Sequence, residues 1–329
     1  YALSDYYSSR YSKKGFHVDD STLSQVYNNS AENALTNQAV QETKGMIMQD
    51  VNGGLVDARY YSTSGGYGAG RHEVWSDANG QFPGTSVNYL TAKSYVYDPA
   101  NPSQMYDINT QDEAALNAFY KNLSLTGYDS ESYYFRWKVN FSRTELEKTI
   151  NANLAGRYAA DPKFILTKDA SGNFVSKAIP ATGIGTLKNL YVVKRGEGGN
   201  MMELVVEGTT GTYKIVKEYN IRFTVRPSKT YTGSTSSVLT YRAKGGSTNY
   251  DTAFTLKDYT ILPSAFATFD IARAADSSIS NVTFYGGGNG HGVGMSQYGA
   301  SSLGAMGWDY QQILNAYYAG MKITSLYNQ

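Results

Sequence analysis

Residues 288–300 read GNGHGVGMSQYGA and place five glycines around a single histidine, His291. Glycine adopts positive φ angles readily and lets the backbone approach a ligand closely. We expect a helix over 295–306, and the unpaired N–H groups at its start would face the same space as His291. Such a site can hold a polar or anionic substrate beside a proton-transfer group. The alternative is a glycine-rich turn in which His291 only joins loops through hydrogen bonds.

A second stretch, STSGG at 62–66, ends a predicted strand and is followed by HEVW at 72–75. Small hydroxyl groups beside glycines suit sugar hydroxyl or acetamido groups, and Trp75 can stack on a sugar face. The alternative is an ordinary loop with a buried tryptophan. We expect His17 and His72 to be surface or hydrogen-bonding residues. Glu73 receives no role, because chain neighbours such as His72 and Glu73 usually point apart.

The composition excludes several classes of protein. The 329 residues carry 29 Lys+Arg against 28 Asp+Glu, and a net charge of +1 is unlike a general nucleic-acid coat. Cysteine is absent, which excludes disulfides, thiol catalysis and cysteine-based zinc sites, and only three histidines remain. No apolar run is long enough to span a membrane. With 30 Tyr and 33 Gly, the uncharged polar surface suits an extracellular protein that meets glycans.

Hydrophobic periodicity and turn residues predict an α+β, strand-rich fold. Helices are expected over 31–44, 111–123, 143–154, 295–306 and 309–318. Strands are expected over 46–49, 55–61, 137–141, 190–194, 201–206, 212–216 and 282–285. A turn at Asn52-Gly53-Gly54 would join the first two strands, and Ser142 with Glu145 forms a predicted capping box. Residues 220–225 suit either a strand or a short helix, and residues 227–250 suit a long loop.

The string HGVGMSQYGA at 291–300 resembles the C-terminal signature of the stage II sporulation protein D (SpoIID)/LytB family. Further matches follow in the family's order, so the resemblance covers most of the chain. They are Asp20-Ser21, Gln25-Val26-Tyr27, Ala39-Val40, Thr43-Lys44-Gly45, 61–66 (YSTSGG), Glu73-Val74-Trp75, Tyr89-Leu90, Trp137, Gly183-Ile184-Gly185, Ile221-Arg222, Gly307, Ile313-Leu314 and 317–320 (YYAG).

This resemblance implies a secreted or membrane-anchored cell-wall protein. Sporulation members of the family are lytic transglycosylases, which cleave the MurNAc–GlcNAc bond of peptidoglycan and close a 1,6-anhydro ring on MurNAc. One Glu can protonate the glycosidic oxygen and then take the proton of the 6-hydroxyl. LytB-type members enhance a cell-wall amidase. The implied partners are peptidoglycan glycan strands and an amidase, without nucleic acid.

The sequence departs from the family pattern in two places. The family's proposed catalytic Glu precedes a helix whose end Tyr1-Ala2-Leu3 resembles, so we expect that Glu, and any anchor, upstream of residue 1. Neither Glu42 nor Glu73 occupies the matching position. Some members bind zinc through Cys and His near Asp20–Tyr27, but here Cys is absent and Leu23 stands where His is common. We therefore expect no such zinc, no other metal and no cofactor.

These observations lead to one prediction for the site and three hypotheses for the function. Residues 1–98 and 263–329 are predicted to form a SpoIID-like core around a glycan cleft, with 99–262 as an inserted helical and β-rich lobe. The leading hypothesis is lytic transglycosylase activity. The alternative is a non-catalytic, wall-binding amidase enhancer. A third hypothesis, a structural surface-layer component, rests on composition alone. The residues predicted to support catalysis are His291, Gln297 and Tyr298, and those predicted to bind substrate are Ser62, Ser64, Gly65, Gly66, Trp75, Gly292 and Ser296.

Overall fold

The computed structural model describes residues 11–21, 24, 26 and 28–327. The predictions for Tyr1-Ala2-Leu3, Leu23, Gln25 and Tyr27 lie outside these residues. The chain forms two compact units, one of residues up to Arg59 and from Asp309 onward, and one of residues Tyr60–Trp308. Both predicted boundaries, near 98 and 263, lie within the second unit. The division into a glycan-cleft core and an inserted lobe stays a prediction.

The first unit is a small mixed α/β body. Its elements are η1 (Ser12–Lys14), α2 (Ala34–Glu42), β1 (Met46–Gln49), α8 (Tyr310–Tyr317) and β16 (Lys322–Ser325). Strand β1 has the predicted bounds, but its partner is β16, in antiparallel register with Met46 opposite Ser325. The predicted turn exists, because Asp50 and Gly54 close it with a 2.8 Å backbone hydrogen bond. The predicted strand over 55–61 is reduced to one bridge, from Gln49 to Leu55, and to Tyr60–Tyr61, which pairs elsewhere.

The central sheet of the second unit has the strand order β11-β10-β4-β13-β12 and is antiparallel throughout. Its strands are β4 (Arg136–Ser142), β10 (Leu239–Ala243), β11 (Asp251–Lys257), β12 (Ala267–Arg273) and β13 (Ile279–Gly286). Strand β4 lies in the middle and buries alternate residues, Trp137, Val139 and Phe141, as a half-buried strand requires. Because β4 and β10 pair within a sheet that also holds β12 and β13, segments of the predicted insert and of the predicted core share one sheet.

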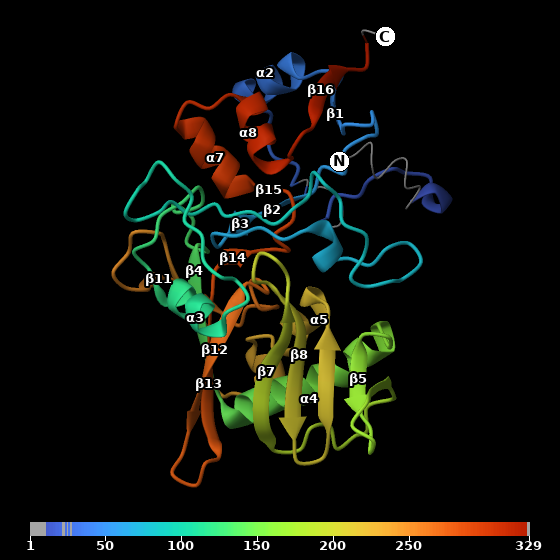
Figure 1. Cartoon of the computed structure of the whole chain (residues 1–329), viewed down its shortest axis with the longest axis vertical. Coiled ribbons are helices and arrows are strands. Elements are labelled where there is room, and N and C mark those ends of the chain that lie inside the picture. Colours follow the sequence, from blue (N-terminus) through green and yellow to red (C-terminus); the bar gives the residue numbers. More distant parts are fainter. Residues whose placement is uncertain (1–10, 22–23, 25, 27, 328–329) are drawn as a thin grey trace. The chain divides into compact units, whose positions relative to one another are not determined.

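A second five-stranded sheet has the order β6-β5-β9-β8-β7 and is also antiparallel. Its strands are β5 (Ile165–Lys168), β6 (Phe174–Ser176), β7 (Leu187–Arg195), β8 (Met201–Gly208) and β9 (Thr212–Val216). Helices α4 (Arg143–Ala160) and α5 (Glu218–Thr224) pack against this sheet (Figure 1). One buried cluster unites both sheets through α4, whose Leu146, Ile150 and Leu154 are fully buried. This core gives the second unit a rigid base for its loops.

Several local predictions can be compared with the observed elements. Helix α4 begins after Ser142, and the predicted capping box with Glu145 is present. Residues 218–224 form helix α5, so the segment around 220–225 is a short helix and not a strand. The predicted long loop over 227–250 is wrong, because it contains α6 (Lys229–Thr232) and strand β10. The fold is α+β, as predicted, and within the described residues no helix is long and apolar enough to cross a membrane.

The remaining elements of the second unit position the loops of the predicted site. They are β2 (Tyr60–Tyr61), β3 (Thr63–Ser64), η2 (Arg71–Glu73), α3 (Glu113–Lys121), β14 (Gly288–Asn289), β15 (Met295–Ser296) and α7 (Gln297–Ala305). Two-stranded ladders join β14 to β3 in antiparallel register and β15 to β2 in parallel register. Segments more than two hundred residues apart in the sequence thereby become neighbours.

Candidate functional site

The two stretches singled out in the sequence lie side by side. Gly288 pairs with Ser64, and Met295 pairs with Tyr60, so the glycine-rich loop between them crosses the end of the 62–66 loop. The approach is so close that a Cβ on Gly65 would lie 2.2 Å from the carbonyl carbon of Gly287. No side chain fits at Gly65 without separating the two loops. Glycine at position 65 therefore allows the two backbones to come into contact.

A buried carboxylate, Asp129, joins the two loops from beneath. Its Oδ1 accepts the backbone N–H groups of Ser64 at 3.0 Å and Gly299 at 3.1 Å, and the Ser296 hydroxyl donates to the same oxygen. Asp129 is 1% exposed, and its Oδ2 has no hydrogen-bond partner within the described part of the chain. Burial raises the pKa of Asp129 to about 7, although the three donors act to lower it.

Sequence reasoning missed Asp129 entirely. It lies 65 residues from Ser64 and 170 from Gly299. No local motif surrounds it, and its function depends on partners that only the fold brings close. An isolated Asp in a polar segment carries no signal that distinguishes it from a surface residue.

Several residues predicted to bind substrate lie inside the site. Ser64 and Ser296 are 2% and 0% exposed, and the Ser64 hydroxyl donates to the Tyr67 carbonyl at 3.1 Å. The Ser296 hydroxyl accepts the Gly299 N–H and caps α7. These hydroxyl groups hold the backbone of the site in the arrangement described, and a direct contact with substrate stays a prediction.

The surface of the site contains an aromatic group around His291. The His291 ring lies 4.8 Å from the Trp75 ring and 5.7 Å from the Tyr61 ring, measured between centroids. Nδ1 of His291 accepts the Val293 N–H at 3.1 Å. A neutral imidazole that accepts at Nδ1 carries its proton at Nε2, which makes Nε2 a hydrogen-bond donor.

The other predicted residues lie on the same two loops and at the start of α7. Gln297 and Tyr298 are exposed at the start of α7, and the Tyr298 N–H donates to the Ser62 carbonyl at 3.1 Å. Gly66 and Gly292 both have positive φ, +116° and +80°, so the turns on either side of the site depend on glycine. A half-buried indole beside an imidazole can pack against the face of an uncharged polar ring.

His72 and Glu73 lie together, and the expectation that they point apart is wrong. They belong to the 3-10 turn η2, in which successive side chains are separated by about 120° and not by the 180° of a strand. Ligand atoms of His72, Glu73 and Glu197 all lie within 4.8 Å of one another. Glu73 is 2% exposed and accepts the N–H groups of Glu197 at 2.6 Å and Gly70 at 3.0 Å. Burial raises the pKa of Glu73, and these two hydrogen bonds act to lower it.

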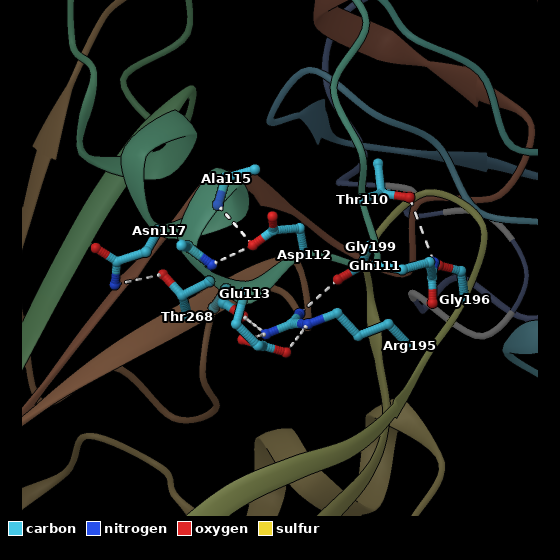
Figure 2. Close-up of polar contacts among 12 residues, drawn as sticks. Thr110, Gln111, Asp112, Glu113, Ala115, Asn117, Arg195, Gly196, Gly199 and Thr268 are labelled. Carbon is cyan, nitrogen blue, oxygen red and sulfur yellow. Dashed lines mark hydrogen bonds and ion pairs between the residues drawn. The ribbon is translucent and has the colours of Figure 1, made fainter.

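Glu197 belongs to the 196–200 loop between β7 and β8. Residues at and just before the start of α3 hold this loop through hydrogen bonds and an ion pair. Figure 2 shows the Arg195 guanidinium between the Glu113 carboxylate, at 2.6 and 2.8 Å, and the Gly199 carbonyl, at 2.6 Å. Gln111 Nε2 donates to the Gly196 carbonyl at 2.9 Å, and the Thr110 hydroxyl donates to the Glu197 carbonyl at 2.6 Å. The backbone at 196–200 is therefore fixed, whereas the Glu197 side chain is exposed.

Comparison with known proteins gives one informative relative. No family model matches the sequence. The chain is 30% identical over 314 residues to a protein of Bacillus subtilis (strain 168) named amidase enhancer. The alignment covers 95% of this chain but 36% of the relative, so the chain spans little more than a third of that protein's length.

Proposed function

We propose that this chain binds peptidoglycan glycan strands and enhances a cell-wall amidase. Two findings support the proposal: the signature loop resembles that of the SpoIID/LytB family, and the chain is similar to a protein named amidase enhancer. The observation that carries the proposal is the surface built around Trp75 and His291. It is assembled by the same signature loop that resembles the family, and it lies against the 62–66 loop. An extracellular or wall-associated location follows from this function.

The chemistry of the surface suits a glycan. Sugar rings present C–H faces that stack on aromatic side chains, and their hydroxyl and acetamido groups exchange hydrogen bonds with polar groups at the rim. Trp75 and the 47% exposed Tyr298 supply aromatic area. The Nε2–H of His291 and the amide of Gln297 supply polar groups of the kind that sugar oxygens bind.

An enhancer needs this binding surface but needs no acid of its own. The test is to add the purified chain to a cell-wall amidase and to measure peptide release from purified peptidoglycan. We expect the chain to bind the peptidoglycan in a sedimentation assay and to raise the amidase rate. Binding without any rate increase would leave a wall-binding module and contradict the enhancer function.

Lytic transglycosylation is the second candidate, and the placement of His291 in the site surface favours it. The reaction requires an acid, and none of the three residues predicted to support catalysis is a carboxylic acid. The discriminating experiment digests peptidoglycan with this chain and with its His291→Ala variant, and reads 1,6-anhydroMurNAc ends by mass spectrometry. Anhydro products from the unchanged chain, lost in the variant, would establish the transglycosylase. Binding without such products favours the enhancer.

A further inference from the structure

A pocket of the same unit differs in chemistry from the surface around Trp75 and His291. It is open, has a volume of about 450 Å³, and lies between η2 and the 196–200 loop, with His72, Glu73 and Glu197 in its wall. Neither Trp75 nor His291 lines it. The function proposed above does not use these three residues, which are brought together from two parts of the chain more than a hundred residues apart.

Three side chains converge in this pocket with atoms that bind metals. Their nitrogen and oxygen atoms lie within 4.8 Å of one another. Ligand atoms about 2.1 Å from one zinc ion lie at most about 4.2 Å apart, so a small rotation of exposed Glu197 completes the approach. His72 Nδ1 is buried and has no hydrogen-bond partner within the described residues. A metal ion binds the lone pair of an unprotonated imidazole nitrogen. No hydrogen bond among the described residues occupies the His72 Nδ1 atom.

A fourth side chain, that of Asn200, is directed to the same place. Asn200 is 1% exposed, and neither its Oδ1 nor its Nδ2 has a hydrogen-bond partner in the described part of the chain. A Cβ on Gly196 would lie 2.4 Å from Asn200 Oδ1 and 2.5 Å from Glu73 Oε2, so both oxygens lie over the same glycine. A buried amide without partners is unfavourable, and a metal ion coordinated by Oδ1 would satisfy that oxygen.

The two glutamates of the pocket are not neutralised by an ion pair in the described part of the chain. Glu73 is buried, yet no Lys or Arg among the described residues forms an ion pair with it or with Glu197. Two cations also line the pocket: Arg195 is bound to Glu113, and the exposed Lys194 forms no ion pair with either glutamate among the described residues. A buried carboxylate usually has a paired cation or coordinates a metal. A divalent cation would neutralise both glutamates at once.

We propose that His72, Glu73, Glu197 and Asn200 form a site for one divalent metal ion of the zinc class. One imidazole with two carboxylates suits a first-row transition metal, whereas Ca²⁺ requires six to eight oxygen ligands and Mg²⁺ retains most of its water. The site contains no cysteine, so it differs from the Cys-His zinc site that the sequence excludes. Its occupation would tie η2, which leads directly to Trp75, to the fixed 196–200 loop.

The test is metal binding by the whole chain after removal of metal with a chelator and dialysis. We expect the chain to take up one Zn²⁺, measured by mass spectrometry of the metal and by titration calorimetry, and Zn²⁺ to raise its thermal midpoint. Glu197→Gln changes an exposed side chain and is expected to fold normally, yet to weaken Zn²⁺ binding by about tenfold or more. His72→Ala is expected to do the same.

Glu207→Gln is the matched control, because Glu207 lies on strand β8, outside the pocket. We expect this variant to bind Zn²⁺ as the unchanged chain does. The proposal is overturned if the unchanged chain takes up no Zn²⁺, or if the double variant of His72→Ala and Glu197→Gln binds it equally tightly. Stoichiometric uptake of Ca²⁺ in preference to Zn²⁺ would likewise contradict a site of the zinc class.

Discussion

Two regions of the second unit each bury a carboxylate, and they satisfy it differently. Asp129, beneath the signature loop, and Glu73, in η2, are 1% and 2% exposed, and each accepts two backbone N–H groups from separate segments. Burial raises the pKa of both. The difference lies in their other neighbours. Asp129 meets a hydroxyl donor, from Ser296, whereas Glu73 meets an imidazole nitrogen, an amide oxygen and a second carboxylate.

This difference determines what each carboxylate can do. Where the neighbours are donors, the carboxylate organises them and can also hold a proton, so Asp129 fixes the signature loop. Where the neighbours are acceptors, a cation is the missing partner, so Glu73 is suited to a metal.

The largest effect is expected for Asp129→Ala. The change removes the nearest acceptor of the Ser64 N–H, the Gly299 N–H and the Ser296 hydroxyl, which keep only contacts of 3.3–3.4 Å. Each buried hydrogen bond to a charged group that is lost costs about 1.5–3 kcal/mol. We expect the free energy of unfolding to fall by about 3 kcal/mol or more, measured by urea denaturation. Asp129→Asn keeps one side-chain oxygen and should lose much less. Equal losses for the two variants would show that Asp129 does not organise the loops by accepting hydrogen bonds.

The next effect is on the pH dependence of stability. The pKa of Asp129 rises from 3.8 in the unfolded chain to about 7 on folding, so the folded state binds a proton more tightly. The stabilisation is fully present below about pH 4 and is lost as the pH rises through 7, by roughly 2–4 kcal/mol. The difference in unfolding free energy between the unchanged chain and Asp129→Asn isolates this effect. A difference independent of pH between 4 and 8 would contradict it.

A third prediction separates the two carboxylates by metal. Zn²⁺ at a hundred times its dissociation constant should stabilise the unchanged chain by about 2.7 kcal/mol. Asp129→Asn should gain as much, because Asp129 is not a ligand, whereas Glu73→Gln should gain little. Thermal unfolding with and without Zn²⁺ measures this. Equal gains in all three proteins would place the metal elsewhere.

A smaller effect is expected at the crossing of the two loops. Gly65→Ala puts a Cβ 2.2 Å from Gly287 and should destabilise the chain by about 1–2 kcal/mol. Gly156→Ala is the control, because this helical glycine has nothing within 4 Å of an added Cβ. That control should stabilise α4 by about 0.5–1 kcal/mol. A harmless Gly65→Ala in urea denaturation would contradict the close approach of the loops.

Sequence patterns were sufficient where a feature is local. The capping box at Ser142 and the alternation in β4 both follow from neighbouring residues. Helix α7 was predicted from residue 295, two residues too early, because Met295 and Ser296 form strand β15. The signature loop and the 62–66 loop were also recognisable as the two halves of one site. Strand β10 was missed because it is short and lies in a stretch rich in Ser, Thr and Gly. Its buried face carries the polar Thr240, and only the pairing with β4 makes it a strand.

What the sequence did not show depends on contacts between distant segments. Asp129 has no motif, and its partners come from two other parts of the chain. Glu197 and Asn200 stand in a glycine-rich turn, and nothing near them indicates that His72 and Glu73 lie opposite. The pairing of β1 with β16 likewise joins the two ends of the described chain.

The most direct test of the central claim is glycan binding by variants of the site surface. Purified peptidoglycan is sedimented with the unchanged chain, with Trp75→Ala and His291→Ala, and with Phe254→Ala as a control for loss of an aromatic ring, since Phe254 is exposed on β11. We expect both site variants to keep their fold, judged by circular dichroism, and to lose binding by about tenfold, and the control to bind normally. Unchanged binding by folded Trp75→Ala and His291→Ala proteins would contradict the assignment of this surface to peptidoglycan.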